Sequence, residues 1–464
     1  MVGRSAFTHR SPYDNTWQNV ITYDTRNSLE IKHRILKTGL KNWSNKTYSE
    51  RSNCLLNLIE ILKVNKKELI DLVCLETGKL KSLSESEFEA AIRILRMCSA
   101  YEFLPSGDIL TSVNSRRFVY DVRSPHGIAL LIFPSNAPLP NFLGKIAPAL
   151  MAGNVVFAKP SPYTGAVFGK LLDLLRDAGI EEEFLQRLDG EGEIVREALE
   201  LGIDLVSFTG STRVGSKILT MSSGVMPKII LECGGQSSLI VLPSANLIES
   251  VKFFCDSAFS NTGQRCVAAK RALVHDSIFD DFQAAVVSHM ESTKFGLDID
   301  AQIGPMCSSV YVESLSRSVS QISNFVDHIM LGYPGTQNEF TFQPRLLIDK
   351  GESKFEQAEE LYGPVSILSK FACLDEASDI CNASEFRLSA AVWTRDLMEI
   401  SYFKRSLMYG VINFNGPTHG SEPNFPFGGF GLSGNGIKDS GWKSIEEYST
   451  SKVISIFESG KIYE

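Results

Sequence analysis

Residues 154–179 read NVVFAKPSPYTGAVFGKLLDLLRDAG, and this stretch decides the fold class. NVVFAK is a short apolar run typical of a buried strand. GAVFGKLLDLLRDAG places apolar residues three and four apart and ends on a glycine, as an amphipathic helix does. The alternation returns at 204–223, where DLVSFTG predicts a strand and STRVGSKILTMSS predicts the following helix. Strands that alternate with helices predict a doubly wound, mostly parallel α/β sheet.

The pattern extends in both directions from this core. Residues 28–105 are predicted to be mostly helical, and residues 109–133 are predicted to form strands in the runs ILTSV, RRFVYDV and GIALLIF. A second series follows residue 236, with helices near 246–260 and 280–292 and strands at 271–275, 365–370 and 389–394. Because no low-complexity linker separates the two series, we expect two α/β units joined by a tight crossover.

The composition excludes several classes of protein. The chain has 464 residues and a formal net charge of −8, with dispersed lysine and arginine, so no basic surface for nucleic acid or a membrane is expected. No apolar run approaches the roughly 18 residues of a membrane span, and the polar N-terminus does not resemble a secretory leader. Nine cysteines at scattered spacings indicate neither a disulfide framework nor a zinc site, and they favour a reducing cytoplasm.

Two segments combine glycine turns with residues suited to binding or catalysis. FTGSTRVG (208–215) joins a strand to a helix through small residues, so its backbone N–H groups could bind a phosphate. NTGQRC (261–266) places Cys266 after a polar turn and beside Arg265, a cation that can lower a thiol pKa and create a nucleophile. The alternatives are an ordinary strand-to-helix turn and a buried, inert cysteine.

Two further segments contain polar side chains in unusual places. LECGG (231–235) puts Glu232 at the end of an apolar strand, where α/β folds hold their sites and where an unpaired carboxylate is costly. FPSNAPLP (133–140) holds Asn136 among three prolines, so that its amide could donate to an oxyanion. A solvated strand end and a rigid turn are the alternatives. Together the four segments predict a reaction centre with a nucleophile, a base, an oxyanion donor and a dinucleotide site.

Eight blocks resemble the aldehyde dehydrogenase superfamily, in the family's order and over nearly the whole chain. The blocks are ETGK (76–79), PSNAP (134–138), KIAPALMAGN with VVFAKPS (145–161), FTGSTRVG, LECGG, NTGQRC, EELYGPV (359–365) and PFGGFGLSGNG (426–436). The resemblance implies an NAD(P)-dependent, non-acylating aldehyde dehydrogenase. It also implies a Rossmann-like cofactor domain, a catalytic α/β domain and a small oligomerisation sheet.

Carried over position by position, the resemblance assigns chemistry to three residues. Cys266 matches the nucleophile, which forms a thiohemiacetal with the aldehyde and then a thioester. Asn136 and the backbone N–H of Cys266 match the groups that hold the oxyanion. Glu232 matches the general base that activates the hydrolytic water. No metal site is implied.

The resemblance also implies a set of residues that bind NAD or NADP. These residues belong to the strand end that reaches the adenine-side ribose, the pyrophosphate turn at a helix start, and the loop that holds the nicotinamide ribose. They are Lys159 and Ser161, then Gly210, Ser211 and Gly215, and finally Glu360 with Tyr362, which stands where the family usually has phenylalanine.

Three positions depart from the family's common pattern. Pro162 stands where NAD-preferring relatives usually carry an acid, so we expect NADP to be used at least comparably with NAD. Cys233 replaces the leucine that usually follows the glutamate. The tail SGNGIKDSGW (433–442) differs from the commonest version and does not indicate a subfamily.

The implied domains follow from the same blocks. Residues 1–109 and 125–235 are expected to form the NAD(P)-binding domain, and 236–427 the catalytic domain. Residues 110–124 and 447–464 are expected to supply oligomerisation strands. The family forms dimers or tetramers through such strands, so a cytoplasmic homodimer or homotetramer is expected.

Two other functions compete with this interpretation. An acylating, coenzyme-A-dependent relative would release the acyl group to a thiol, but such relatives generally lack the glutamate found at position 232. A catalytically inactive dinucleotide-binding relative is the other alternative. As for the substrate, Arg265 could pair with a phosphate or carboxylate on the aldehyde, or it could form a salt bridge to a neighbouring acid.

Overall fold

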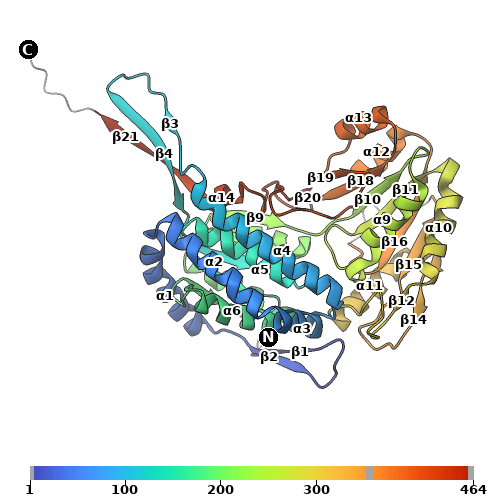
Figure 1. The fold of residues 1–464 in the computed structure, drawn as a ribbon, viewed down its shortest axis with the longest axis horizontal. Helices are drawn as coiled ribbons and strands as arrows, with labels where there is room; N and C mark the ends of the chain where they lie inside the picture. The colour runs from blue at the N-terminus through green and yellow to red at the C-terminus, as the bar shows by residue number, and fades with distance from the viewer. Residues whose placement is uncertain (1–4, 352–359, 458–464) are drawn as a thin grey trace, which may run out of the picture.

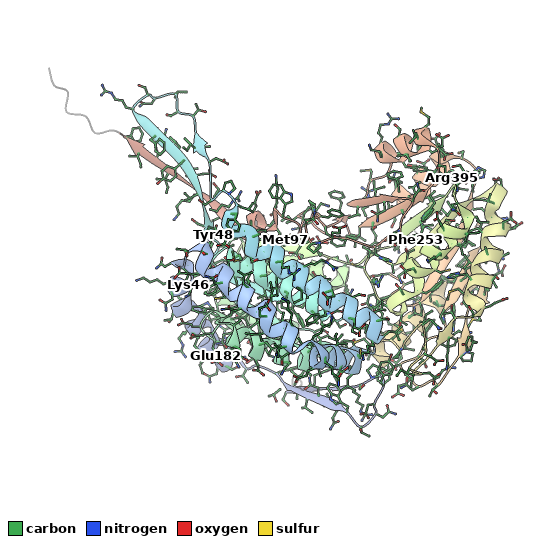
Figure 2. All side chains as sticks on the ribbon, in the orientation of Figure 1. Lys46, Tyr48, Met97, Glu182, Phe253 and Arg395 are labelled. Atoms are coloured by element: carbon green, nitrogen blue, oxygen red, sulfur yellow. The ribbon has the colours of Figure 1, made fainter. Side chains whose placement is uncertain are left out.

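The computed structural model describes residues 5–351 and 360–457 of the chain. Figure 1 shows two α/β units side by side and a small antiparallel sheet that projects from the first unit. Tyr48 and Met97 lie in the first unit, and Phe253 and Arg395 lie in the second (Figure 2). Among these described residues, no helix has the length and apolar character that a membrane span requires.

Four helices precede the first large sheet in the chain and pack within the same unit (Figure 1). Threonines fix the starts of the first two helices, because Thr25 and Thr47 each form a capping box with the residue three positions later. The helical prediction for residues 28–105 is therefore confirmed. The elements of this region are β1 (Ala6–Arg10) paired antiparallel with β2 (Gln18–Thr22), then α1 (Arg26–Ser44), α2 (Tyr48–Val64), α3 (Lys66–Thr77) and α4 (Lys81–Ser99).

The first unit contains a five-stranded parallel sheet in the order β7-β6-β5-β8-β9. Its strands are β5 (Ile128–Ile132), β6 (Val155–Lys159), β7 (Leu185–Arg187), β8 (Leu205–Thr209) and β9 (Lys228–Glu232), and its helices are α5 (Pro138–Met151), α6 (Gly165–Asp177), α7 (Gly192–Glu200) and α8 (Thr212–Ser222). The strand order reverses at β5, which pairs with β6 on one side and β8 on the other. In doubly wound folds such a reversal opens a crevice at the carboxyl ends of the strands.

The second unit contains a seven-stranded sheet in the order β13-β15-β16-β11-β10-β18-β19, parallel except where β13 meets β15. Four residues separate β9 from β10, so the tight crossover is confirmed. The strands are β10 (Ser237–Val241), β11 (Ala269–His275), β13 (Val326–Met330), β15 (Arg345–Asp349), β16 (Val365–Phe371), β18 (Ser389–Trp393) and β19 (Val411–Phe414), and the helices are α9 (Leu247–Phe259), α10 (Phe279–Glu291), α11 (Ser309–Ile322), α12 (Leu374–Ala383) and α13 (Leu397–Ser406).

A three-stranded antiparallel sheet projects from the first unit as an arm (Figure 1). It consists of β3 (Ile109–Leu110), β4 (Arg117–Pro125) and β21 (Ser449–Phe457). The strand predicted for ILTSV is wrong beyond Leu110. Residues after Leu110 leave the sheet in a hairpin loop, where Asn114 accepts a hydrogen bond from the backbone N–H of Arg116 over 2.9 Å.

The sheets divide the chain close to the predicted domain boundaries, and the roles given to those domains stay predictions. Residues 428–446 had no assignment. They include β20 (Phe430–Gly431), which pairs with β17 (Phe386–Arg387), and most of the short α14 (Ser444–Glu447). Of the expected oligomerisation segment 447–464, residues 458–464 lie outside the described residues. The remaining small pair is β12 (Lys294–Phe295) with β14 (Tyr333–Pro334).

Candidate active site

Asn136 lies in the loop between β5 and α5, at the carboxyl end of the central strand of the first sheet. The side chain of Asn141 donates to the Oδ1 of Asn136 over 3.1 Å. Because that contact occupies the amide oxygen, it orients the amide nitrogen of Asn136 as a free donor. The loop therefore presents an oriented N–H group, which an oxyanion site requires.

A buried ion pair, Lys79 with Glu87, contacts the Asn136 loop and fixes its position. The ammonium group of Lys79 pairs with Glu87 and also donates to the backbone oxygen of Asn136 over 2.8 Å. The other carboxyl oxygen of Glu87 accepts from the backbone N–H of Leu139 over 2.8 Å. The sequence indicated only that ETGK is a family block. The contact of Lys79 with the Asn136 loop was missed because no local pattern joins Lys79 to Glu87 and Asn136.

Cys266 follows an unusual backbone turn, the short 3-10 helix η3 (Ser260–Gly263). Asn261 and Thr262 have φ angles of 52° and 56°, in the left-handed region that non-glycine residues rarely adopt. Thr262 Oγ1 donates to the oxygen of Gly304 over 2.9 Å, and Asn261 Nδ2 donates to the oxygen of Asn136 over 3.3 Å. Such strain persists where surrounding contacts enforce it, and here they bring Cys266 towards the Asn136 loop.

The thiol of Cys266 is not a ready thiolate in this structure. Burial, together with the charges of Glu360 and Glu232, raises its pKa to about 12. The sequence-based expectation of a lowered pKa for this thiol is therefore wrong, because desolvation and two nearby carboxylates raise it. The same electrostatic contacts show that the structure brings Cys266, Glu232 and Glu360 together.

Glu232 ends strand β9 and its side chain is 4% exposed. By distance and angle, neither carboxyl oxygen forms a hydrogen bond within the described part of the chain, although the backbone N–H of Gly429 acts to lower the pKa of this carboxyl. Burial raises the pKa of Glu232 well above its ordinary value, and the charge of Asp439 adds to this, whereas Lys145 and Lys438 oppose it. A buried, unpaired carboxyl with a raised pKa is suited to accept a proton near neutral pH.

A buried network lies beside Glu232. Lys145 on α5 forms an ion pair with Asp439 and donates to the hydroxyl of Ser207 over 2.7 Å. The hydroxyl of Tyr448 donates to the same carboxylate over 2.6 Å. Sequence reasoning missed this network because Lys145 and Asp439 come from regions 294 residues apart.

The predicted adenosine-side residues lie at the end of β6, next to the Asn136 loop. Lys159 is 9% exposed, and burial lowers its pKa to about 8 although Asp189 and Glu191 oppose the shift. No described residue forms a hydrogen bond or ion pair with its ammonium group. Ser161 accepts from the backbone N–H of Tyr163 over 3.3 Å and so begins the short helix η2 (Pro162–Thr164). An isolated buried cation fits a polar or anionic ligand at this place.

The turn between β8 and α8 fits a pyrophosphate. Ser211 is the N-cap of α8, but its side chain makes no capping hydrogen bond, so N–H groups of the first turn stay available to an anion. The backbone N–H of Gly210 donates to the oxygen of Glu232 over 3.1 Å. A Cβ atom on Gly215 would lie 2.9 Å from the sulfur of Cys233, so only glycine allows this helix to approach β9.

The predicted nicotinamide-side residues lie beside the crossover after β9. The carboxylate of Glu360 packs so closely that a Cβ atom on Gly234 would lie 2.0 Å from it. Tyr362 donates its hydroxyl to the oxygen of Gln264 over 3.4 Å, two residues before Cys266. No described contact joins Glu360 directly to Lys159. Tyr311 links the two regions through ring contacts. Its ring lies 5.5 Å from that of Tyr362, near Glu360, and 5.3 Å from that of Tyr163, near Lys159.

Arg265 is half-buried beside Cys266. Burial lowers its pKa, and the charge of Asp256 opposes this. Asp256 contacts His419 over 2.8 Å, and although burial alone would raise the pKa of Asp256, His419 and Arg265 bring it below its ordinary value. The cation predicted at the site entrance therefore has an acid nearby.

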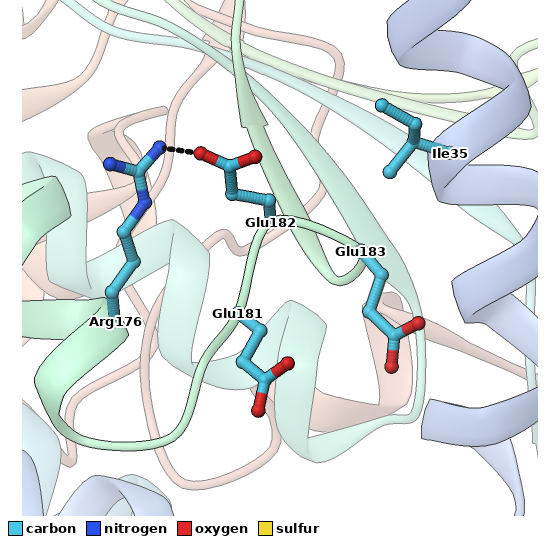
Figure 3. A pocket seen from close by; sticks show the side chains of 5 residues that line it. All are labelled: Ile35, Arg176, Glu181, Glu182 and Glu183. Carbon is cyan, nitrogen blue, oxygen red and sulfur yellow. Dashed lines mark hydrogen bonds and ion pairs between the residues drawn. The ribbon is translucent and has the colours of Figure 1, made fainter.

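Two other observations bear on the site. Over residues 5–351 and 360–457 no group of three or more His, Cys, Asp or Glu side chains could hold a metal ion. A surface hollow lies elsewhere, between α1 and the loop after α6, where Arg176 pairs with Glu182 over 2.6 Å (Figure 3). Its other lining residues are Ile35, Glu181 and Glu183. None of the residues assigned to the reaction lines this hollow.

Comparison with known proteins decides the family. The model of the aldehyde dehydrogenase family matches residues 3–454. The chain belongs to the aldehyde dehydrogenase family. It is 31% identical to benzaldehyde dehydrogenase YfmT of Bacillus subtilis, over 97% of this chain and 93% of that protein. It is 28% identical to the D-glyceraldehyde dehydrogenase (NADP(+)) of Picrophilus torridus, over 89% of this chain and 86% of the relative.

Solved structures agree with this family assignment. PnpE from Pseudomonas sp. WBC-3 superposes with a TM-score of 0.92 at 26% identity, and the match covers 99% of this chain and 96% of that protein. PnpE has also been solved in complex with nicotinamide adenine dinucleotide. The predicted fold class and the class of enzyme, an NAD(P)-dependent aldehyde dehydrogenase, are thus confirmed.

Proposed function

We propose that this aldehyde dehydrogenase oxidises its substrate to a carboxylic acid through a thioester on Cys266, which water activated by Glu232 then hydrolyses. The observation that carries the proposal is the buried carboxyl of Glu232, which lacks a hydrogen-bond partner among described residues yet acts electrostatically on the Cys266 thiol. A buried acid without a partner is costly to keep, which supports a functional role.

The first step forms a bond between the sulfur of Cys266 and the aldehyde carbon. Because burial keeps the thiol neutral, its proton must leave during the attack, and it passes to solvent at this half-buried side chain, so that Glu232 stays ionised for the later hydrolysis. The carbonyl oxygen becomes an oxyanion as the bond forms. The amide nitrogen of Asn136, oriented by Asn141, and the backbone N–H of Cys266 donate to this oxygen.

The residues on the cofactor side fit NAD or NADP. Lys159 would donate to the adenine-side ribose with Ser161 beside it, the Gly210–Ser211–Gly215 turn would hold the pyrophosphate, and Glu360 would accept from the nicotinamide ribose. The bound nicotinamide supplies the hydride acceptor. Loss of hydride from the thiohemiacetal carbon leaves a thioester on Cys266, and the Tyr362 hydroxyl contacts the loop of Cys266 at Gln264.

The thioester is released by water. Glu232 takes a proton from the water as its oxygen attacks the thioester carbonyl, and the Cys266 thiolate leaves and is reprotonated. The product is a carboxylic acid and the enzyme returns to its starting state. The Lys145–Asp439 pair stands next to Glu232, so it can influence the proton that Glu232 receives.

An assay with a panel of aldehydes tests this function against its alternatives. We expect reduced cofactor to form with at least one aldehyde in the absence of coenzyme A. Strict dependence on coenzyme A would instead identify an acylating enzyme, and no turnover with any aldehyde, despite cofactor binding, would indicate an inactive relative. The panel includes neutral, phosphorylated and carboxylated aldehydes, each with NAD and with NADP.

The substrate proposal is narrower and rests on Arg265. We infer that a phosphate or carboxylate on the aldehyde pairs with this guanidinium group at the site entrance. The names of relatives include an alpha-ketoglutarate semialdehyde dehydrogenase of Haloferax volcanii as well as benzaldehyde dehydrogenases. Since these names cover both anionic and neutral aldehydes, the Arg265 side chain carries the proposal by itself.

The projecting arm supports assembly into a homodimer or homotetramer in the cytoplasm. Apolar side chains on its three strands are exposed, including Ile109 (77%), Val453 (60%) and Phe457 (60%). Exposed apolar residues concentrated on sheet edges usually mark a protein interface, and a second copy of the chain is the occupant we propose. All nine cysteines are free, in keeping with a reducing compartment. Val453→Lys should shift the mass in solution towards the monomer.

A further inference from the structure

Lys270 is a buried lysine that the reaction described above does not use. It lies near the start of β11 and is 3% exposed. Its ammonium group donates to the oxygen of Gly263 over 2.8 Å and to the oxygen of Gly363 over 2.7 Å. Gly263 belongs to the turn before Cys266, and Gly363 follows Glu360 and Tyr362. The Lys270 side chain therefore joins the loop that carries Cys266 to the loop that carries Glu360.

The two loops are shaped to meet at this lysine. Gly263 has a φ of +64°, and a Cβ atom on it would lie 2.0 Å from the oxygen of Gly363. The loops therefore touch through backbone, and their two carbonyl oxygens converge on a shared donor. Two oxygens that approach each other without a cation would repel, so the Lys270 ammonium group compensates the charge at this contact.

Lys270 also faces Glu360 electrostatically. Burial raises the pKa of Glu360 to about 7, and the charge of Lys270 and a backbone hydrogen bond at Gly235 oppose that shift. Burial likewise lowers the pKa of Lys270 to about 7, opposed by Glu360. The other groups that act on or sense Glu360 are the thiols of Cys266 and Cys233 and the phenol of Tyr362, which are neutral. The charge of Lys270 thus favours the ionised form of this buried carboxyl.

We propose that Lys270 is a positioning residue for cofactor binding, which locks the Cys266 turn against the Glu360 loop and holds Glu360 as the carboxylate that accepts from ribose hydroxyls. This inference rests on the proposed role of Glu360 as a ribose ligand. It predicts that the lysine changes cofactor affinity through Glu360 rather than through general stability.

The test is a double-mutant cycle on the affinity of the full-length enzyme for NADH and NADPH, followed by cofactor fluorescence. Lys270→Gln keeps a donor but removes the charge, and we expect it to weaken binding about tenfold near neutral pH. Binding should recover in part at about pH 9, because Glu360 without its cation ionises only at higher pH. In the Glu360→Gln background the Lys270→Gln change should cost little further affinity. Lys370→Gln, at an exposed lysine of β16, is the matched control and should bind as wild type.

Equal losses from Lys270→Gln in both backgrounds, or no loss in either, would overturn the inference. If Glu360→Gln alone bound as wild type, the ribose role of Glu360 would fail instead. Should Lys270→Gln not fold, the binding measurement is replaced by the free energy of unfolding of Glu360→Gln, measured against pH. There the unpaired lysine is costly while protonated, so the destabilisation relative to wild type should be larger at about pH 6.5 than at about pH 9. A destabilisation that is independent of pH would also overturn the inference.

Discussion

The side chain of Asn261 donates to the backbone oxygen of Asn136 over 3.3 Å, so the turn that carries Cys266 is tied to the loop that carries the proposed oxyanion donor. The same oxygen accepts from Lys79 over 2.8 Å. Two segments more than a hundred residues apart therefore meet at one carbonyl group. Their relative position, on which oxyanion binding depends, is set by two side-chain donors that share one backbone carbonyl.

Cys266→Ala should abolish the oxidation of every aldehyde, because no other group in this mechanism forms the thioester. The affinity for NADH and NADPH should change little, since the proposed cofactor ligands lie on other loops. Steady-state turnover and fluorescence titration measure the two effects. Cys373→Ala, at an exposed cysteine, is the control and should keep wild-type activity. Substantial turnover by Cys266→Ala would show that the nucleophile has been misassigned.

Glu232→Gln should separate formation of the thioester from its hydrolysis. Without the base, rapid mixing should show a burst of reduced cofactor near one per site, followed by a much slower steady rate. The burst should become faster as pH rises, because the neutral thiol with its raised pKa must lose a proton. In wild type the steady rate should rise with pH through the raised pKa of Glu232, above the ordinary carboxylate range. Equally slow burst and steady phases in the variant would assign Glu232 to activation of Cys266 instead.

The sequence indicated the fold and the candidate reacting residues because both depend on local signals. Alternating strand and helix patterns predicted the two parallel sheets, and short motifs marked Cys266, Glu232 and Asn136. The supporting pairs could not be predicted in this way. Lys145 meets Asp439 only because α5 packs under the C-terminal segment, and Lys270 contacts Gly363 across two loops. Such contacts depend on tertiary packing, for which a single sequence carries no periodic or spacing signal.

Cofactor choice should depend on Pro162. A carboxylate here would repel a 2′-phosphate and bind a free 2′-hydroxyl, whereas proline does neither and leaves the unpartnered Lys159 as a phosphate partner. We therefore expect wild type to use NADP at least comparably with NAD, and Pro162→Glu to shift the kcat/KM ratio towards NAD by about tenfold or more. Initial rates with both cofactors measure this. A wild-type preference for NAD above roughly a hundredfold, about 2.7 kcal/mol, would mean that another residue discriminates.

Arg265 should determine whether the enzyme prefers an anionic aldehyde. Its guanidinium group is half-buried next to Cys266, and Asp256, which is paired with His419, is the acid that competes for it. If the substrate anion binds here, Arg265→Ala should lower kcat/KM for an anionic aldehyde. The loss of transition-state stabilisation should be about 1.5–3 kcal/mol, the range for a hydrogen bond to a charged group. A neutral aldehyde of similar length should lose far less. Arg317→Ala, on the exposed face of α11, controls for loss of positive charge and should leave both rates unchanged. An equal loss for the two aldehydes would show that Arg265 serves the structure through Asp256, and the anionic-substrate proposal would then be abandoned.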